Sequence, residues 1–472
     1  MIRQLLTATF LHMRTSASRL RHYLLALAIL PVFGQRARGQ MPSDSAVQAI
    51  IQARVTTRQA VGIVVAVVDR GRTKLFTAGS SGATGVTLDG NTVFEIGSIT
   101  KVFTSALLAD MVARGEVSLD DPISRYLPAS VRVPTRDGRE IKLVDLATQF
   151  SGLPRLPRNL SPRDARNPYA DYTVEQLYAF LSGYELTRGI GDRYEYSNLG
   201  VGLLGHVLAL RAGKSYEQLV KERILEPLRM RDTRIVLTPA LKERLAVGHD
   251  EAGSMTWSWD LPTLAGAGAL RSTANDMVKF LVANLDSPTS PLALALASTR
   301  VARRDVPGGP LEIGLGWHIL TPFGRPIVWH NGGTGGYRAF IGLDHGARRG
   351  VVVLSNQAIS PDDIGMHLLE TRIPLTPPPK QRQEIAVDSA VLATYVGVYE
   401  ISPAFALTVT REGSSLFAQA TGQERLRLFA ESPTEFFYRI VDAQVTFEKD
   451  ARGRVVRLIL HQGGQHIPGA RK

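Results

Sequence analysis

The stretch from Gly97 to Gly115, GSITKVFTSALLADMVARG, restricts the fold of this chain more than any other part of the sequence. A Gly-Ser start and a glycine at the end are typical of a helix. Ahead of its last residues the stretch carries only two charged side chains, Lys101 and Asp110. A helix that is apolar on nearly every face is normally buried on all sides. The chain must therefore pack protein all around this helix, and Lys101 is predicted to be a buried lysine.

The segments on either side of this helix predict how it is covered. Two strands are expected within residues 61–80, and helices alternate with Pro- and Gly-rich loops over residues 119–263. Helices at residues 46–55 and 364–372 open and close the region. Strand-like runs precede the last helix at residues 314–320, 326–330, 337–345 and 350–356. This order predicts an α/β (α+β) domain, with an antiparallel sheet flanked by helices.

The character of the sequence changes after residue 375. Residues 376–388 form a Pro-rich linker, because clustered prolines favour an extended, semi-rigid spacer. From Tyr395 onward, seven short alternating runs separated by turn residues are typical of a small all-β barrel or sandwich. The sequence therefore predicts four parts: a signal peptide over 1–39, a main domain over 40–375, the linker, and a C-terminal β domain over 389–472.

The first 39 residues predict export. They carry six arginines and no acidic residue, around an apolar run, LLALAILPVF, that is too short for a stable membrane-spanning helix. Ala37-Arg38-Gly39 offers a small-x-small cleavage site, and a start at Met13 gives a signal of more usual proportions than Met1. A mitochondrial transit peptide or an uncleaved anchor is the alternative. We expect an exported chain, periplasmic or secreted, without a transmembrane helix in its mature form.

Charge and cysteine content exclude several classes of protein. The formal net charge is +12, and the six arginines of the signal leave about +6 for the remainder. A nucleic-acid binder needs a basic stripe or a reading motif, and the sequence has neither. The chain has no cysteine, which excludes disulfides, Cys-based metal sites and a Cys nucleophile.

Ser98 and Lys101 form the first chemical motif. Their i, i+3 spacing places both side chains on one helix face, one turn apart. A serine hydroxyl is a poor nucleophile until a base takes its proton. A lysine can be that base only if its pKa falls, which burial and a helix N-terminus both promote. A capping serine beside an incidental lysine is the alternative, since this spacing arises by chance about once in a chain of this size.

Tyr196 and Asn198 form the second motif, on a polar loop ahead of an apolar helix. A tyrosine can relay a proton to a leaving group if cations lower its pKa. An asparagine can hold a substrate amide or orient the lysine. A surface tyrosine and a capping asparagine are the alternative.

A histidine followed by glycines, in VWHNGGTGGYRAF, forms the third motif. A strand ends in His330-Asn331-Gly332, and Gly333 follows. Glycine lets a strand approach a ligand closely, and the N–H of Gly333 can join that of Ser98 as a donor to a developing oxyanion. The run lacks the Lys-Ser/Thr pair of a phosphate-binding loop. The chain also lacks Gly-x-Ser-x-Gly and His-Glu-x-x-His.

FEIGSITK, YSN and HNG, in this order, resemble the Ser-x-x-Lys, Tyr-x-Asn and Lys/His-x-Gly motifs of the class C β-lactamase and DD-peptidase family of serine hydrolases. LATQFSGLPRLP and GEVSLDDPISRYLP resemble that family's stretches between the first two motifs. The resemblance covers about residues 47–371 and implies a β-lactamase/transpeptidase-like domain. Residues 395–466 resemble the small lipocalin-like β-barrel domain appended to many members.

The resemblance implies an acyl-enzyme mechanism that needs no metal or cofactor. In it, Ser98 attacks a carbonyl, Lys101 and Tyr196 share the proton transfers of acylation, and Tyr196 activates the water of deacylation. The implied substrate-binding residues are Asn198, which also holds Lys101, and His330, Asn331 and Gly332. The implied oxyanion hole is made by the N–H groups of Ser98 and Gly333.

His330 departs from the β-lactamase pattern, in which a lysine usually stands at this place. Histidine there resembles the DD-peptidase, D-aminopeptidase and esterase branches. A histidine need not be charged near neutral pH, although it can still donate a hydrogen bond to a substrate carboxylate. The remaining histidines are interpreted as packing or surface residues, among them His206, His249, His318 and His461.

The leading hypothesis is a serine hydrolase of β-lactam amides or D-Ala-type peptides. A small-ester hydrolase of the same family is the alternative, and an inactive binding homologue that works through its β-barrel is a third reading. The expected partner is a small-molecule or peptide substrate (β-lactam, D-Ala peptide or ester), with no nucleic acid. The C-terminal domain is the candidate for contacts in an oligomer.

Overall fold

The computed structural model of this chain describes residues 41–377, 382–403, 405–423, 425–438, 443–462 and 465–472. The predicted signal peptide and the middle of the predicted linker lie outside these residues. Among the helices described, none is long and apolar enough to cross a membrane.

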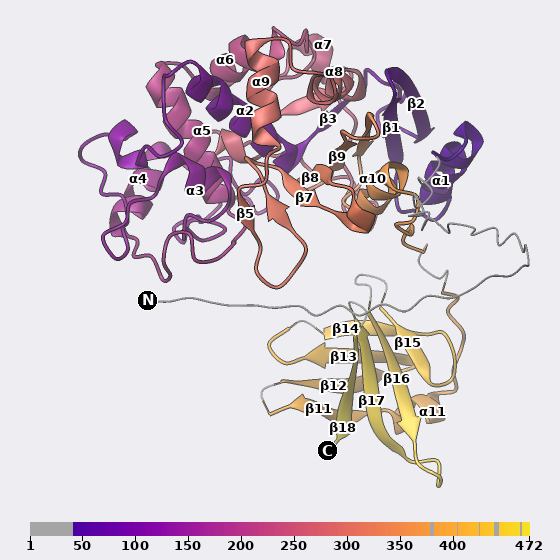
Figure 1. Ribbon diagram of the computed structural model, residues 1–472. Coiled ribbons are helices and arrows are strands. Elements are labelled where there is room, and N and C mark those ends of the chain that lie inside the picture. The colour runs from indigo at the N-terminus through magenta and orange to yellow at the C-terminus, as the bar shows by residue number, and fades with distance from the viewer. Residues whose placement is uncertain (1–40, 378–381, 404, 424, 439–442, 463–464) are drawn as a thin grey trace, which may run out of the picture. The chain divides into compact units, whose positions relative to one another are not determined.

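The main domain is built on an eight-stranded antiparallel sheet (Figure 1). The strand order is β2-β1-β10-β9-β8-β7-β6-β5, so the first hairpin of the domain joins its last strands. Ile63 pairs with Ser355, and the register continues to Asp69 and Arg349. The strands are β1 (Gly62–Asp69), β2 (Arg72–Gly79), β5 (Arg304–Asp305), β6 (Glu312–Ile313), β7 (His318–Leu320), β8 (Ile327–Gly333), β9 (Arg338–Asp344) and β10 (Arg349–Ser355).

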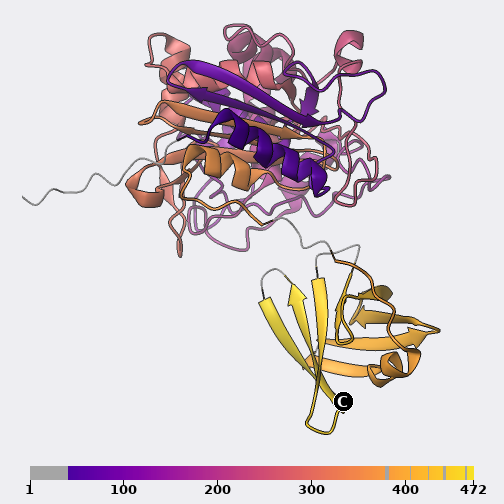
Figure 2. The same cartoon turned by 90° about the vertical axis from the view of Figure 1, so that its right-hand side faces the viewer.

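Helices cover both faces of this sheet. On β1, Ile63, Val65 and Val67 pack with α1 (Asp44–Thr56) and α10 (Asp362–Leu369), which Figure 2 shows in indigo and orange against one face. The alternate side chains of β1 pack into the helical layer on the other face. A strand that is buried on both sides has no polar face, which explains the continuous apolar run of β1.

The apolar helix of the first motif is α2 (Thr100–Ala113), and its residues from Thr100 to Met111 are all buried. Phe103 stacks on Phe280 of α8 with ring centroids 4.2 Å apart. The predicted burial on all sides is confirmed. The helical layer also contains α3 (Leu143–Ala147), α4 (Val174–Gly183), α5 (Asn198–Ala212), α6 (Tyr216–Val220), α7 (Pro239–Lys242), α8 (Ala274–Leu285) and α9 (Pro291–Thr299).

The ends of some predicted elements differ from the structure by a few residues, as two elements of the main domain show. The closing helix was expected at 364–372, but α10 begins at Asp362 and ends at Leu369. The run at 314–320 is a strand only over its last three residues, because Gly316 adopts a left-handed φ of +71° that breaks the strand.

The C-terminal domain is a closed antiparallel barrel of eight strands. Its core is aromatic, with Tyr395 stacked on Phe447 at 4.2 Å between ring centroids. The sequence predicted seven strands, and it missed β18, which closes the barrel against β11, because Pro468 interrupts its pattern. The elements are α11 (Ser389–Thr394), β11 (Gly397–Ser402), β12 (Phe405–Glu412), β13 (Ser415–Ala420), β14 (Arg425–Ala430), β15 (Glu435–Phe437), β16 (Ala443–Lys449), β17 (Val455–Gln462) and β18 (Gln465–Arg471).

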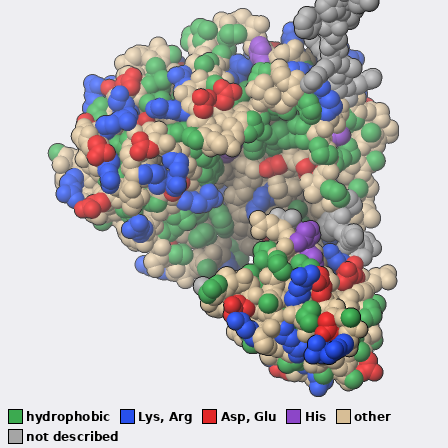
Figure 3. Space-filling model, turned by 60° about the horizontal axis from the view of Figure 1, so that its bottom comes forward, with side chains coloured by type: hydrophobic (Ala, Val, Ile, Leu, Met, Phe, Trp, Pro, Cys, Tyr) green, Lys and Arg blue, Asp and Glu red, His purple; other side chains and the backbone are tan. Residues whose placement is uncertain are grey.

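The surface carries charges of both signs. On the face drawn in Figure 3, basic and acidic side chains are interspersed rather than gathered into one basic stripe. This mixture of charges agrees with the ordinary net charge of the chain without its first 39 residues.

Candidate active site

Ser98 stands where a short strand turns into the buried helix. β3 (Val93–Glu95) leads through the 3₁₀ turn η1 (Gly97–Ile99) directly into α2. Gly97 makes this turn with a φ of +50°, and a Cβ on it would lie 2.6 Å from the backbone nitrogen of Gly333. Only glycine fits there, so the local sequence places the partly exposed Ser98 at the contact between α2 and the end of β8.

Lys101 is fully buried and has three polar neighbours. Its Nζ lies 2.9 Å from Ser98 Oγ, 2.9 Å from Asn198 Oδ1 and 2.7 Å from the carbonyl oxygen of Ala267. Burial holds the pKa of Lys101 well below its ordinary value, and the charge of Arg155 lowers it further. These two effects favour the neutral amine.

A neutral lysine amine fits these partners atom by atom. It has two N–H donors and one lone pair. The Asn198 Oδ1 and the Ala267 carbonyl can only accept, so they take the two N–H groups. The lone pair then faces the Ser98 hydroxyl, which is the one partner that can donate. The arrangement can therefore remove the proton of Ser98.

Tyr196 lies beside the same amine. Lys101 Nζ is 4.8 Å from the centroid of the Tyr196 ring. Burial raises the pKa of the Tyr196 hydroxyl, while a hydrogen bond with Ser98 and the charge of Arg155 oppose the rise without cancelling it. The charge of Arg155 therefore does not bring the pKa of Tyr196 below its ordinary value. Tyr196 therefore keeps its proton near neutral pH and suits the role of proton donor.

Asn198 is held from both ends. Its Oδ1 accepts from Lys101, and its Nδ2 donates to the Tyr169 hydroxyl at 3.1 Å. The residue opens α5 behind the cap of Ser197, whose Oγ accepts from the backbone N–H of Gly200 at 2.8 Å. The side chain is thus oriented before any substrate arrives.

The end of β8 lies against the Ser98 turn. A Cβ on Gly332 would lie 1.9 Å from the carbonyl oxygen of Ile96 and 3.1 Å from the backbone nitrogen of Ser98. This contact brings the backbones of Gly333 and Ser98 together, as two oxyanion donors require.

The structure separates Asn331 from the other predicted site residues. Asn331 Nδ2 donates to the carboxylate of Asp362 in α10, on the opposite face of the sheet from Lys101. Strand alternation explains this placement, because His330 and Gly332 face Ser98 while Asn331 faces away.

His330 is buried and stacks on a second histidine that the sequence interpretation did not assign to the site. The imidazoles of His330 and His318 lie 4.9 Å apart with an interplanar angle of 14°. His330 Nδ1 lies 2.6 Å from the Asn331 carbonyl oxygen, so Nδ1 carries the proton, and His318 Nε2 lies 3.1 Å from the Tyr194 hydroxyl. Burial and the neighbouring charges lower the pKa of His330 well below its ordinary value and that of His318 to about 4. Both imidazoles are therefore neutral near neutral pH.

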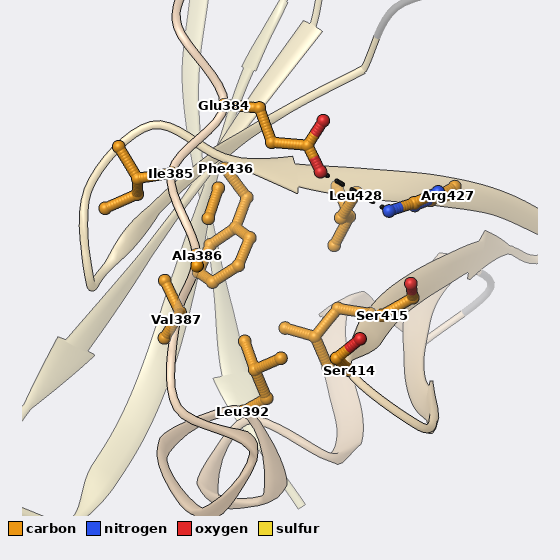
Figure 4. A pocket seen from close by; sticks show the side chains of 12 residues that line it. Glu384, Ile385, Ala386, Val387, Leu392, Ser414, Ser415, Arg427, Leu428 and Phe436 are labelled. Atoms are coloured by element: carbon orange, nitrogen blue, oxygen red, sulfur yellow. Dashed lines mark hydrogen bonds and ion pairs between the residues drawn. The ribbon is translucent and has the colours of Figure 1, made fainter.

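The C-terminal domain has a cavity of about 370 Å³ (Figure 4). Its lining includes the apolar residues Val387, Leu392 and Phe436, and an ion pair of 3.3 Å joins Arg427 to Glu384 at its edge. Among the described residues that line this cavity, there is no serine–lysine pair like Ser98 and Lys101, so the candidate active site is the one in the main domain.

The low pKa of Lys101 predicts a pH dependence for acylation. The amine must be neutral to accept a proton. Acylation therefore runs at its full rate above the pKa of Lys101 and slows as the pH falls through that pKa. Because that pKa lies well below the ordinary 10.5, the rising limb of kcat/KM should also lie well below pH 10.5. The rise of the acylation rate with pH is measured by stopped flow with an uncharged ester. A rise centred at the ordinary lysine pKa would contradict the assignment of a neutral Lys101 as the base.

Comparison with known proteins places this site in a family context. Residues 47–371 match the family described as Beta-lactamase, and residues 381–471 match a domain of unknown function, DUF3471. The D-alanyl-D-alanine-carboxypeptidase/endopeptidase AmpH of Escherichia coli (strain K12) is 35% identical over 300 residues, which are 61% of this chain and 72% of AmpH. Penicillin-binding protein 4* of Bacillus subtilis (strain 168) is 26% identical over 398 residues, 76% of this chain and 83% of that protein. The crystal structure of a class C β-lactamase from Rhodobacter sphaeroides superposes with a TM-score of 0.61 at 25% identity, covering 70% of this chain and 99% of that one.

Proposed function

This chain belongs to the β-lactamase family, and from that premise we propose that it is a serine hydrolase that forms an acyl-enzyme on Ser98. The resemblance predicted from the three motifs is confirmed at the level of the family and the fold. The observation that carries the proposal is the environment of Lys101. The Lys101 amine is fully buried, and two of its partners can only accept hydrogen bonds. Its lone pair is therefore free to take the proton of Ser98.

Acylation follows from this geometry. Ser98 Oγ attacks the substrate carbonyl carbon as its proton passes to Lys101 Nζ, and the N–H groups of Ser98 and Gly333 bind the oxyanion. The bond to the leaving group then breaks, and the leaving atom takes a proton from Tyr196, which is replenished from Lys101. Asn198 holds Lys101 and offers its amide to the substrate.

Deacylation reverses the proton transfers. Water attacks the acyl carbon as its proton passes to Tyr196, and the proton of Tyr196 moves on to Lys101. Lys101 returns a proton to Ser98 Oγ when the acid leaves. The original Ser98 proton thus departs with the leaving group, and a proton of the attacking water replaces it.

The proposed substrates are β-lactam amides and D-Ala-type peptides, in keeping with the names of the relatives. A small-ester hydrolase is the second candidate, because the neutral His330 offers no positive charge to a substrate carboxylate. We further propose that residues 1–39 export the chain and that the hydrolase domain spans residues 40–375. The role of the barrel in an oligomer stays a prediction.

A parallel turnover panel tests this proposal. Nitrocefin, a peptide ending in D-Ala-D-Ala and p-nitrophenyl butyrate are given to the wild type and to Ser98→Ala. We expect the wild type to hydrolyse the peptide or nitrocefin and Ser98→Ala to hydrolyse none of the three. Turnover of the butyrate ester alone would favour the esterase, and wild-type turnover that survives in Ser98→Ala would refute the proposal.

A further inference from the structure

Arg155 lies at the candidate active site but had no role in the motifs. It lies in the loop that follows α3. Its carbonyl oxygen accepts hydrogen bonds from the backbone N–H groups of Asn198 at 3.0 Å and Leu199 at 3.2 Å, at the start of α5. Its side chain is exposed, and the guanidinium carbon lies 5.1 Å from the centroid of the Tyr196 ring. The backbone contacts tie this cation to the element that carries Asn198, beside the tyrosine that faces Ser98.

The guanidinium of Arg155 has no anionic partner among the described residues. Two other arginines of the main domain differ, since Arg188 pairs with Glu195 at 2.7 Å and Arg304 with Asp145 at 3.4 Å. For Arg155 neither an ion pair nor a side-chain hydrogen bond is found in the described part of the chain. A guanidinium that lies over an aromatic ring gives none of its N–H groups to an anion, so these groups remain available to an incoming carboxylate.

The other basic side chains around Ser98 offer little positive charge to a substrate, which makes the charge of Arg155 important for binding. His330 and His318 are neutral, and Lys101 is enclosed by its three partners. Arg155 lies near enough to affect the pKa values of Lys101 and Tyr196. A substrate carboxylate that reaches Tyr196 therefore meets a permanent positive charge there rather than on β8.

We propose that Arg155 binds a carboxylate of the substrate through the N–H edge of its guanidinium and so determines the preference for acidic over neutral substrates. This inference rests on the proposed function and deepens it. The charge that most class C β-lactamases place on the strand beside the serine is supplied here from the loop over residues 153–158. The substrate class is then an amide with a free carboxylate on the leaving-group side, next to Tyr196.

Two peptides that differ only in that carboxylate test the inference. One ends in D-Ala-D-Ala with a free carboxylate, and the other ends in the corresponding carboxamide. The measured quantity is the ratio of their kcat/KM values in the wild type, Arg155→Gln, Arg155→Lys and Arg158→Gln. Arg158 is a matched control, because it is an exposed arginine of the same loop that stacks on Tyr184 instead, at 5.4 Å.

We expect Arg155→Gln to lower the ratio of acid to amide about tenfold or more, as the loss of a charge-assisted hydrogen bond implies. Arg155→Lys should keep part of the ratio, and Arg158→Gln should leave it unchanged. An unchanged ratio in Arg155→Gln, or an equal loss on both peptides, would overturn the inference and leave the proposed function standing. A wild type that cleaved neither peptide and took no label at Ser98 would contradict the proposed function itself.

Discussion

Replacing Lys101 with alanine is expected to lower the rate of acylation by a factor on the order of 10²–10⁴, the usual contribution of a positioned general base. The nucleophile is still present in this variant, but the Ser98 hydroxyl has lost the lone pair that faces it at 2.9 Å. Tyr196 cannot take over, because burial raises its pKa and it keeps its proton. The acylation rate is measured by stopped flow with nitrocefin or a p-nitrophenyl ester, whichever the wild type turns over.

A matched lysine separates this effect from a general loss of charge. Lys74 is exposed on β2 and pairs with Asp44 at 2.7 Å, and Lys74→Ala should acylate like the wild type. Thermal unfolding of Lys101→Ala, followed by circular dichroism, checks that the domain still folds. Acylation at the wild-type rate in a folded Lys101→Ala would show that another group takes the proton of Ser98.

Replacing Gly332 with alanine is expected to damage both the site and the fold. The new Cβ would lie 1.9 Å from the oxygen and 2.9 Å from the carbon of the Ile96 carbonyl, and these are backbone atoms that no rotamer change can move. The end of β8 must shift from the Ser98 turn, which separates the N–H groups of Ser98 and Gly333. We expect turnover to fall by about 10²–10³, as on losing one oxyanion donor, and stability to fall by about 1–3 kcal/mol.

Gly309→Ala is the control for this substitution. A Cβ on Gly309 meets no atom within 4 Å, so both the melting temperature and the turnover should stay at wild-type values. Steady-state kinetics and thermal unfolding measure the two effects on the same samples. Wild-type turnover in Gly332→Ala would mean that the contact between β8 and the Ser98 turn does not position the oxyanion donors.

The pairing of Ser98 with Lys101 could be predicted from the sequence because both lie within one helix. The i, i+3 spacing brings the two side chains together wherever the helix lies in the fold. The burial of Lys101 was also predictable, since almost all of its neighbours on α2 are apolar. The placement of Asn331 away from the site could also have been predicted by applying strand alternation to β8. Asn331 follows His330 by one residue and so faces the opposite side of the sheet.

His318 could not be assigned to the site from the sequence. Even the correct strand register pairs His318 with Trp329, whose side chain packs on the face of α1 and α10. The stacking of His318 on His330 arises where β7 begins, two residues after the left-handed turn at Gly316. Such a local departure from regular strand geometry leaves no periodic trace in the sequence.

The third polar neighbour of Lys101 could not be predicted from the sequence either. The carbonyl of Ala267, which accepts from Lys101, belongs to the short 3₁₀ turn Ala265–Ala267 and lies far along the chain from α2. A backbone acceptor has no identity that a motif could reveal. The low pKa of Lys101 could be anticipated from its burial, but the partners that orient its lone pair could not.

Intact-mass spectrometry of the protein after reaction with a fluorophosphonate probe tests the central claim most directly. We expect one covalent adduct on the wild type, located at Ser98 by peptide mapping, and none on Ser98→Ala. An unmodified wild type, or an adduct that persists in Ser98→Ala, would contradict the assignment of Ser98 as the nucleophile.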